Sequence, residues 1–136
     1  MLAKKITYTD YNGNSREEVF YFNLSKAEIM EMELGVAGGM TRMINAMVAA
    51  EDGPGLSKLY KEIILKAYGE KSADGRRFIK SQELRDAFEQ TDAYSELYME
   101  LVTDADKASE FVNGIMPAQR ASVAEDHNKA QLALTE

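Results

Sequence analysis

The chain opens with alternating apolar and polar residues and then changes to the period of amphipathic helices. Residues 4–11 alternate through Ile6 and Tyr8, and a second apolar run returns at residues 16–22. Between the two runs, Asn12-Gly13 supplies the residue types that most readily adopt a positive φ. The pattern predicts an N-terminal β-hairpin.

The register of this hairpin depends on the length of its turn. A two-residue loop would pair Ile6 with Val19, whereas a three-residue loop would pair Ile6 with Phe20. Both alternatives stay open because the second strand is apolar on both faces. A hairpin is marginally stable alone, so we expect helices or a second subunit to cover it. An open strand edge would allow subunits to pair through their sheets.

A helix start follows the hairpin directly. Ser25 and Glu28 have the spacing of a capping box, and Leu24 and Ile29 stand at the two positions of a hydrophobic staple. We expect this helix to end near Leu34, because three glycines between positions 35 and 39 oppose helix continuation.

The next apolar stripe is rich in methionine, and five of the eight methionines lie between positions 30 and 47. Its spacing predicts a helix whose apolar positions are Met40, Met43, Ile44, Met47 and Val48. Methionine is unbranched and polarizable, so such a face can adapt to many apolar partners. Two interpretations stay open: Met40, Met43, Ile44 and Met47 fill an irregular core, or they form a partner-binding face.

Residues 56–68 give the clearest amphipathic pattern of the chain, and Gly69 stands where the helix is expected to stop. We expect this segment to be the central core helix, with Leu59 and Ile63 pointing inward. Three short helices are predicted later, at residues 81–90, 91–102 and 103–113. Their start signals are Ser81, Thr91 and the pair of Thr103 with Asp106, and Asn113-Gly114 is expected to end the last helix.

Residues 70–80 are expected to form a locally basic loop around the turn dipeptide Asp74-Gly75. Phe78 and Ile79 would anchor this loop to the core. Its four basic residues would pair either with acidic helices of the same chain or with an acidic partner. Arg76 and Arg77 therefore join the candidate partner-binding residues.

The predicted fold is α+β and mostly α-helical, with an N-terminal β-hairpin followed by about six short helices. Residues 1–117 are expected to form one globular domain. Residues 118–136 carry no aromatic side chain and few large apolar ones, so we expect a weakly ordered or frayed C-terminal tail.

Charge is distributed unevenly along the 136 residues, whose formal net charge is -7. Residues 1–80 carry 12 basic and 11 acidic side chains, whereas residues 81–136 carry 4 and 12. An acidic helical half repels phosphate backbones, which argues against nucleic-acid binding. It can be a solvated surface, a docking face for a basic partner or a charged shield around a client.

Several other classes of protein find no support in the sequence. No apolar run approaches the roughly 20 residues of a membrane helix, and the N-terminus lacks the apolar core of a signal peptide. The chain has no cysteine and one histidine, His127, in the predicted tail. No phosphate-binding loop, nucleophile elbow or calcium loop occurs, and Asp104 and Asp106 fit a helix-capping role better than a metal site. We therefore expect no cofactor, no metal site and no enzymatic activity.

Two stretches of the sequence carry motifs of a known family. The first is residues 5–33, centred on the run Tyr21-Phe-Asn-Leu-Ser-Lys-Ala-Glu28. The second begins with Tyr68-Gly-Glu-Lys-Ser-Ala-Asp-Gly, continues through Glu100-Leu-Val-Thr-Asp-Ala-Asp106 and ends with Phe111-Val-Asn-Gly-Ile-Met-Pro117. Over about residues 4–117 the chain resembles tail assembly chaperones of long-tailed, siphovirus-like bacteriophages. These motifs are not catalytic, so they indicate relatives without assigning an active residue.

The resemblance implies a function. Such proteins bind the tape-measure protein and keep it soluble while the tail tube polymerises around it, and they are typically absent from the finished particle. It also implies the host cytoplasm as the location, the tail tube protein as a further partner, homo-oligomers, and a longer form made by ribosomal frameshifting. The alternatives are a structural component of the tail or virion, or a small regulator or enzyme whose site is not recognised.

Overall fold

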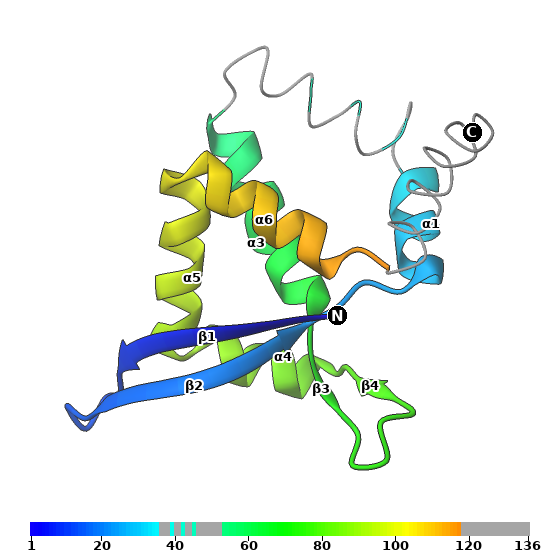
Figure 1. Ribbon diagram of the computed structural model, residues 1–136. Helices are drawn as coiled ribbons and strands as arrows, with labels where there is room; N and C mark the ends of the chain where they lie inside the picture. The colour runs from blue at the N-terminus through cyan, green and yellow to red at the C-terminus, as the bar shows by residue number, and fades with distance from the viewer. Residues whose placement is uncertain (36–38, 40–41, 43–44, 46–52, 118–136) are drawn as a thin grey trace, which may run out of the picture.

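The computed structural model describes residues 1–35, 39, 42, 45 and 53–117. The elements in chain order are β1 (Leu2–Thr9), β2 (Ser15–Phe22), α1 (Lys26–Leu34), α3 (Gly53–Ala67), β3 (Tyr68–Lys71), β4 (Phe78–Ile79), α4 (Gln82–Glu89), α5 (Asp92–Thr103) and α6 (Ala105–Ile115) (Figure 1). These elements confirm the predicted α+β, mostly helical fold. The described residues contain five of the six predicted helices, and the methionine-rich one lies largely outside them.

The first hairpin forms as predicted, but neither register considered from the sequence is observed, because Ile6 pairs with Glu18. The turn is longer than a two-residue loop. The amide of Asp10 donates to the Asn14 carbonyl at 2.8 Å, and the amide of Gly13 donates to the Asp10 carbonyl at 3.0 Å. Gly13 has a φ of 85°, a conformation that glycine adopts without steric cost.

Burial of the aromatic residues explains why the pairing of Ile6 with Val19 is not adopted. Directly opposed residues of an antiparallel pair share one face of the sheet, so Phe20 and Phe22 lie on the face of Ile6. Pairing Ile6 with Val19 would turn both rings to the opposite, exposed face. The Tyr8 hydroxyl also donates to the Glu18 carboxylate at 2.6 Å, which links the two strands further.

The expected loop at residues 70–80 contains a second hairpin, which corrects the prediction from the sequence. Strands β3 and β4 pair antiparallel, with Glu70 opposite Ile79, and β3 joins β2 through the pair Tyr21 and Gly69. All four strands form one sheet in the order β1-β2-β3-β4. A Cβ atom at Gly69 would lie 2.6 Å from the Ile79 carbonyl oxygen, so the close approach of the strands requires glycine there.

Helix α3 is the central core helix that its pattern predicts, and its buried residues include Leu59 and Ile63. Ser81 and Thr91 cap α4 and α5 as expected, since each side-chain oxygen accepts from an amide of the first turn. Thr103 does not cap α6. It is the last residue of α5, and Asp104 caps α6 instead by accepting from the amides of residues 106 and 107. A carboxylate at this position favours the helix start more than a hydroxyl does, because it also carries a negative charge.

Helix α6 also continues past Asn113-Gly114, where it was expected to end. It reaches Ile115, whose side chain is fully buried, so the apolar contact outweighs the low helix propensity of glycine. A Cβ atom at Gly114 would lie 2.9 Å from a methyl group of Leu2. The small residue therefore lets α6 approach β1 closely.

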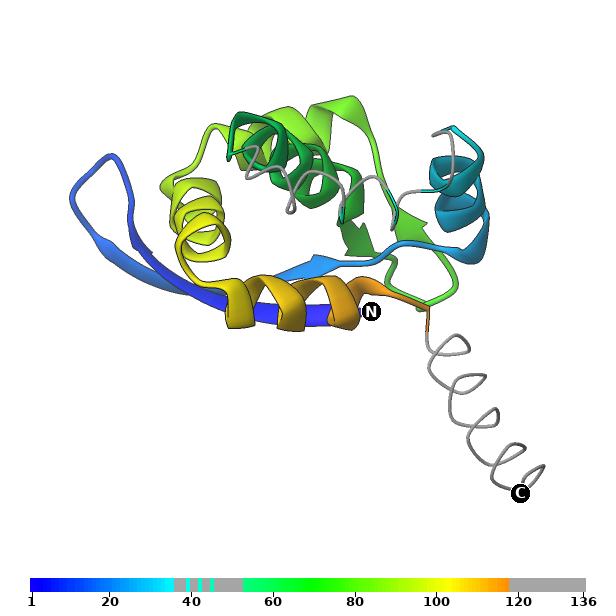
Figure 2. The same ribbon diagram turned by 90° about the horizontal axis from the view of Figure 1, so that it is seen from above.

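The core lies between the sheet and the helices packed on it. Figure 2 shows the green helices α3 and α4 on one side of the blue strands. Aromatic rings from four elements meet there: Phe22 lies 5.2 Å from Phe111, and Tyr68 stacks on Phe88 at 4.3 Å between ring centroids. The outward residues of β1, namely Ala3, Lys5, Thr7 and Thr9, are exposed. One face of this hairpin is thus core and the other is open.

Candidate functional site

Helix α1 exposes two large apolar side chains on its outer surface. Met30 and Leu34 stand one turn apart, with 58% and 79% of their surface accessible. Ile29 and Met32 of the same helix pack against the core instead. Because α1 presents apolar residues on both sides, its exposed side is a candidate protein-binding surface.

An ion pair fixes α1 to the sheet. The Lys80 Nζ donates to both carboxylate oxygens of Glu28 at 2.8 Å and to the Asn23 carbonyl at 2.8 Å. Glu28 also accepts from the Ser25 amide, which completes the predicted capping box. The exposed pair on α1 is therefore held in a defined orientation.

Burial and pairing act in opposite directions on the two charges of this ion pair. Burial would raise the pKa of Glu28, but hydrogen bonds from Lys80 and the Ser25 amide outweigh it and lower the pKa below its ordinary value of 4.5. Burial lowers the pKa of Lys80 below its ordinary value of 10.5, although Glu28 opposes this change. Each group therefore favours the charged form of the other.

The second hairpin presents Arg76 and Arg77 at its tip. The Ser72 hydroxyl donates to the Asp74 carboxylate at 2.8 Å, and the same carboxylate accepts from the Arg76 amide. Gly75 has a φ of 75°, so the turn is well defined. Both guanidinium groups are exposed, and neither forms an ion pair with another described residue.

The other two basic residues of this segment bind within the chain. Lys80 pairs with Glu28 of α1, and the Lys71 ammonium lies 5.6 Å from the centre of the Tyr21 ring. Lys80 thus pairs with an acidic helix of the same chain, as the first alternative has it, whereas Lys71 contacts an aromatic ring and no acidic helix among the described residues. The contact of Arg76 and Arg77 with an acidic partner stays a prediction.

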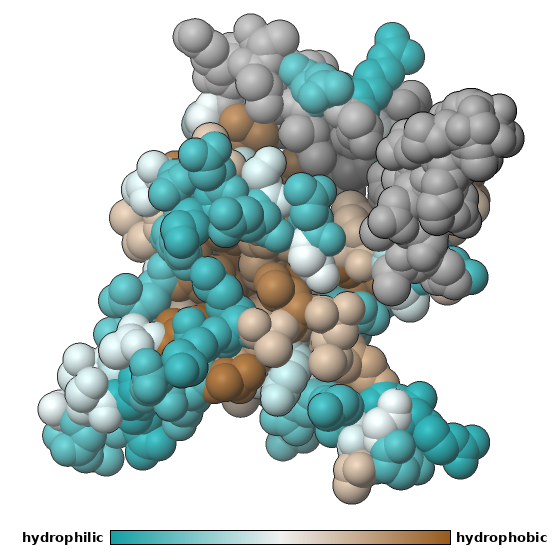
Figure 3. Space-filling model, in the orientation of Figure 1, coloured by the Kyte–Doolittle hydropathy of each residue, from teal (hydrophilic) through white to brown (hydrophobic). Residues whose placement is uncertain are grey.

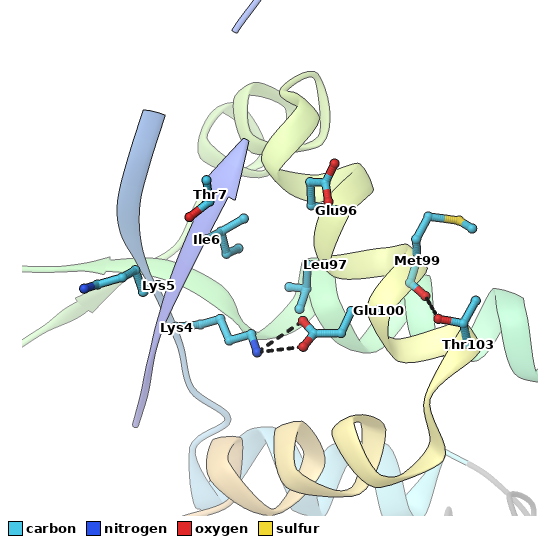
Figure 4. A pocket seen from close by; sticks show the side chains of 9 residues that line it. All are labelled: Lys4, Lys5, Ile6, Thr7, Glu96, Leu97, Met99, Glu100 and Thr103. Atoms are coloured by element: carbon cyan, nitrogen blue, oxygen red, sulfur yellow. Dashed lines mark hydrogen bonds and ion pairs between the residues drawn. The ribbon is translucent and has the colours of Figure 1, made fainter. Parts of the chain in front are cut away.

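A groove runs between strand β1 and helix α5 (Figure 4). Its volume is about 430 Å³, and the residues lining it are Lys4, Lys5, Ile6, Thr7, Glu96, Leu97, Met99, Glu100 and Thr103. In the figure, Lys4 and Ile6 point toward α5 and Lys5 points away. The Lys4 Nζ lies 3.2 Å from the Glu100 carboxylate and joins the two walls.

The surface around this groove is mostly polar. Figure 3 shows hydrophilic side chains over α5 and over the tips of both hairpins, with hydrophobic ones between them. Met99 on the groove wall is 55% exposed and gives this mostly charged surface an apolar side chain. Sequence reasoning considered an open strand edge but missed this groove, because the groove depends on the strand order, which leaves β1 outermost, and on the packing of α5 against β1.

The structure places only part of the predicted binding set. Met40, Met43, Ile44 and Met47 lie outside the described residues, and Arg76 and Arg77 lie at the tip of the second hairpin. Among the described residues, no group of three or more histidine, cysteine or acidic side chains could hold a metal ion. In the same part of the chain, every helix is too short or too polar to cross a lipid bilayer.

Comparison with known protein families gives a match over nearly the whole chain. A family model described as phage tail assembly chaperone matches residues 1–135. No curated protein and no solved structure gives a match to this chain. The family match covers almost the whole sequence, including the hairpins and all described helices.

Proposed function

The chain belongs to the phage tail assembly chaperone family, and from that premise we propose that it binds the tape-measure protein and keeps it soluble during tail tube assembly. Membership in this family indicates a non-enzymatic role with protein partners in tail assembly. The structural observation that supports the finer proposal is the exposed apolar pair of Met30 and Leu34 on α1. A chaperone needs such a surface, because apolar segments of a client aggregate unless they are covered.

The proposed binding face extends beyond α1 along the chain. Helix α1 leads into the methionine-rich segment, so Met40, Met43, Ile44 and Met47 are proposed to contribute to the same apolar face. Arg76 and Arg77 are proposed to contact acidic residues of a partner. The tail tube protein, further copies of this chain and a frameshifted longer form are the other proposed partners. The proposed place of action is the host cytoplasm, with the chain absent from the mature virion.

Charge insertion on α1 tests the proposal. The double variant Met30→Glu with Leu34→Glu should keep its melting temperature within a few degrees of the wild type, because both positions are exposed. It should lose the ability to keep co-expressed tape-measure protein in the soluble fraction, since a carboxylate facing an apolar segment is desolvated without a partner. The measurement is the soluble fraction of tape-measure protein after co-expression with each variant.

Val102→Glu on α5 is the matched control, because Val102 is also exposed and lies far from α1 in the sequence. Met43→Glu with Met47→Glu extends the test to the methionine-rich segment. If that face binds the client, the double variant stays folded and solubilises less client. If it is core, the two charges unfold the protein. A folded double variant that solubilises its client as well as the wild type refutes the methionine-face part of the proposal.

The rival functions are separated by other measurements. A structural component of the tail or virion would be present in purified particles, whereas the proposed chaperone would be absent from them by mass spectrometry. A small regulator or enzyme would show turnover or saturable binding of a small molecule. The nucleotide sequence of the gene tests the longer form, through a slippery heptamer with an overlapping downstream frame.

A further inference from the structure

Strand β1 is the outer strand of the sheet and pairs with β2 alone among the described strands. Adjacent residues of an antiparallel strand direct their amide and carbonyl groups to opposite edges. The Asp10 amide donates to the Asn14 carbonyl, so the even-numbered residues of β1 bond to β2. On β2, the Asn23 amide donates to Ala67 on the opposite edge, which agrees with this assignment.

The backbone groups of the odd-numbered residues in β1 therefore point to the open edge. These residues are Ala3, Lys5, Thr7 and Thr9, and no hydrogen bond from another described residue reaches their outward groups. Lys5 and Thr7 line the groove beside α5 although the Lys5 side chain points away from it. Within the described part of the chain, one wall of the groove thus carries a row of backbone donors and acceptors without partners.

Helix α5 forms the other wall and gives the groove its chemical character. Ile6 and Leu97 are buried at its base, and Met99 is exposed along its side. Glu96 is exposed and forms no ion pair with another described residue, whereas Glu100 is paired with Lys4. The helix side of the groove therefore favours apolar side chains with a positive charge among them.

We propose that this groove binds an extended segment of a client protein, which adds to β1 as a fifth strand of the sheet. The segment would alternate, with apolar residues and one lysine or arginine facing α5, and polar or acidic residues facing outward beside Lys5. Strand addition of this kind obtains affinity from main-chain hydrogen bonds and specificity from alternate side chains. The proposal rests on the chaperone function above for its client, the tape-measure protein.

A second copy of this chain is a poorer occupant than a client strand. Two β1 strands paired edge to edge would bring Lys4 and Lys5 of both copies to the same short stretch of sheet. Like charges on neighbouring strands oppose pairing. The chain also carries a net charge of -7, which favours a basic client strand over a second copy at this edge.

Proline substitution tests the edge directly. Thr7→Pro removes an amide that points into the groove, and Glu17→Pro removes its counterpart on the opposite edge of the same hairpin. Thr7 and Glu17 are direct cross-strand partners, and neither amide bonds to the other strand, so the two variants disturb the hairpin equally. Thr7→Pro should reduce the retention of tape-measure protein at least about tenfold, the effect of losing one or two hydrogen bonds.

Glu17→Pro should retain the client as well as the wild type. Equal retention by both proline variants would overturn the proposal. So would a change in the oligomeric state of the chain alone on Thr7→Pro, since the edge would then join two copies. Sedimentation velocity of each variant without client separates these outcomes.

A charge reversal on the other wall keeps the proposal testable if the proline variants do not fold. Glu96→Lys should weaken client retention about tenfold, whereas Glu110→Lys, an exposed position on α6, should not. Equal retention by these two variants contradicts the proposed chemistry of the groove.

If the proposed chaperone function is wrong, the wild-type chain itself retains no tape-measure protein. This result distinguishes failure of the chaperone function from failure of the groove proposal. The groove is tested in that case with a synthetic peptide of alternating valine and threonine that carries one arginine in place of a valine. Saturable binding to the wild type, weakened by Glu96→Lys, supports the groove. Absence of binding overturns it.

Discussion

Gly69 offers the sharpest test of how the sheet is assembled. Its φ is not in the left-handed region, so the backbone alone does not require glycine there. An ideal Cβ atom would lie 2.6 Å from the Ile79 carbonyl oxygen and 2.7 Å from the Phe78 ring. Both neighbours belong to β4, which pairs with β3, so relief of the first contact requires movement of the backbone.

Gly69→Ala is therefore expected to destabilise the fold through overpacking. Insertion of one methyl group into a tightly packed site costs about 1 to 3 kcal/mol, and the backbone contact places this case toward the upper end. In a domain of this size, about 1 kcal/mol corresponds to roughly 4 °C in melting temperature, so the expected loss is roughly 4 to 12 °C. Thermal melting followed by circular dichroism measures it.

Gly53→Ala is the control, because a Cβ atom at Gly53 meets nothing within 4 Å outside its own chain neighbours. Gly53 is the first residue of α3 and precedes Pro54, so any cost of the substitution is local, and this variant should melt close to the wild-type temperature. If Gly69→Ala melts with the control, β3 and β4 do not approach as closely as described. Gly69 would then serve only to end α3.

Three further predictions concern the core, the tail and the ion pair. Leu59→Ala or Ile63→Ala should each cost about 2 to 5 kcal/mol in denaturant unfolding by removing buried contacts, and near-neutral effects would contradict the role of α3. Truncation after Pro117 should leave the melting temperature nearly unchanged, because the described core ends at residue 115; a loss of several degrees would show that the tail packs on the domain. The pKa of Glu28 is lower in the folded chain than its ordinary value of 4.5, so the ionised carboxylate stabilises the fold. This stabilisation is complete above about pH 4.5 and is lost as the pH falls through the pKa of the folded state. Glu28→Gln should therefore melt below the wild type at neutral pH, with a gap that narrows below about pH 4.5, and a gap independent of pH would refute the pairing of Glu28 with Lys80.

Local signals in the sequence were sufficient for most helix boundaries. The capping box at Ser25 and the caps at Ser81 and Thr91 are all observed, since each depends on a few neighbouring residues. The core position of Leu59 is confirmed for a similar reason, because helix periodicity is local. The domain boundary after Pro117 stays a prediction.

Features that depend on distant contacts could not be read from the sequence. Strand β4 has two residues and β3 carries Glu70 and Lys71, so no alternating pattern marks them. The hairpin register depends on which rings the helices cover. The end of α6 depends on the burial of Ile115 and on the close contact of Gly114 with Leu2 of β1.

Some residues of the candidate site could be predicted from local sequence signals, and others could be found only in the fold. Arg76 and Arg77 were recognised from local charge, and their exposure agrees with a role toward an outside partner. The exposure of Leu34 and the groove along β1 required the fold, because sequence does not show which apolar residues remain uncovered.

The most direct test of the proposed chaperone function is co-purification of the wild-type chain with its tape-measure protein. The two are co-expressed, the soluble fraction is passed over an affinity tag on this chain, and the eluate is separated by size-exclusion chromatography with light scattering. We expect a soluble complex that contains both proteins, and an insoluble tape-measure protein when this chain is omitted. A tape-measure protein that stays insoluble in the presence of this chain, or that is soluble without it and elutes separately, would refute the chaperone function.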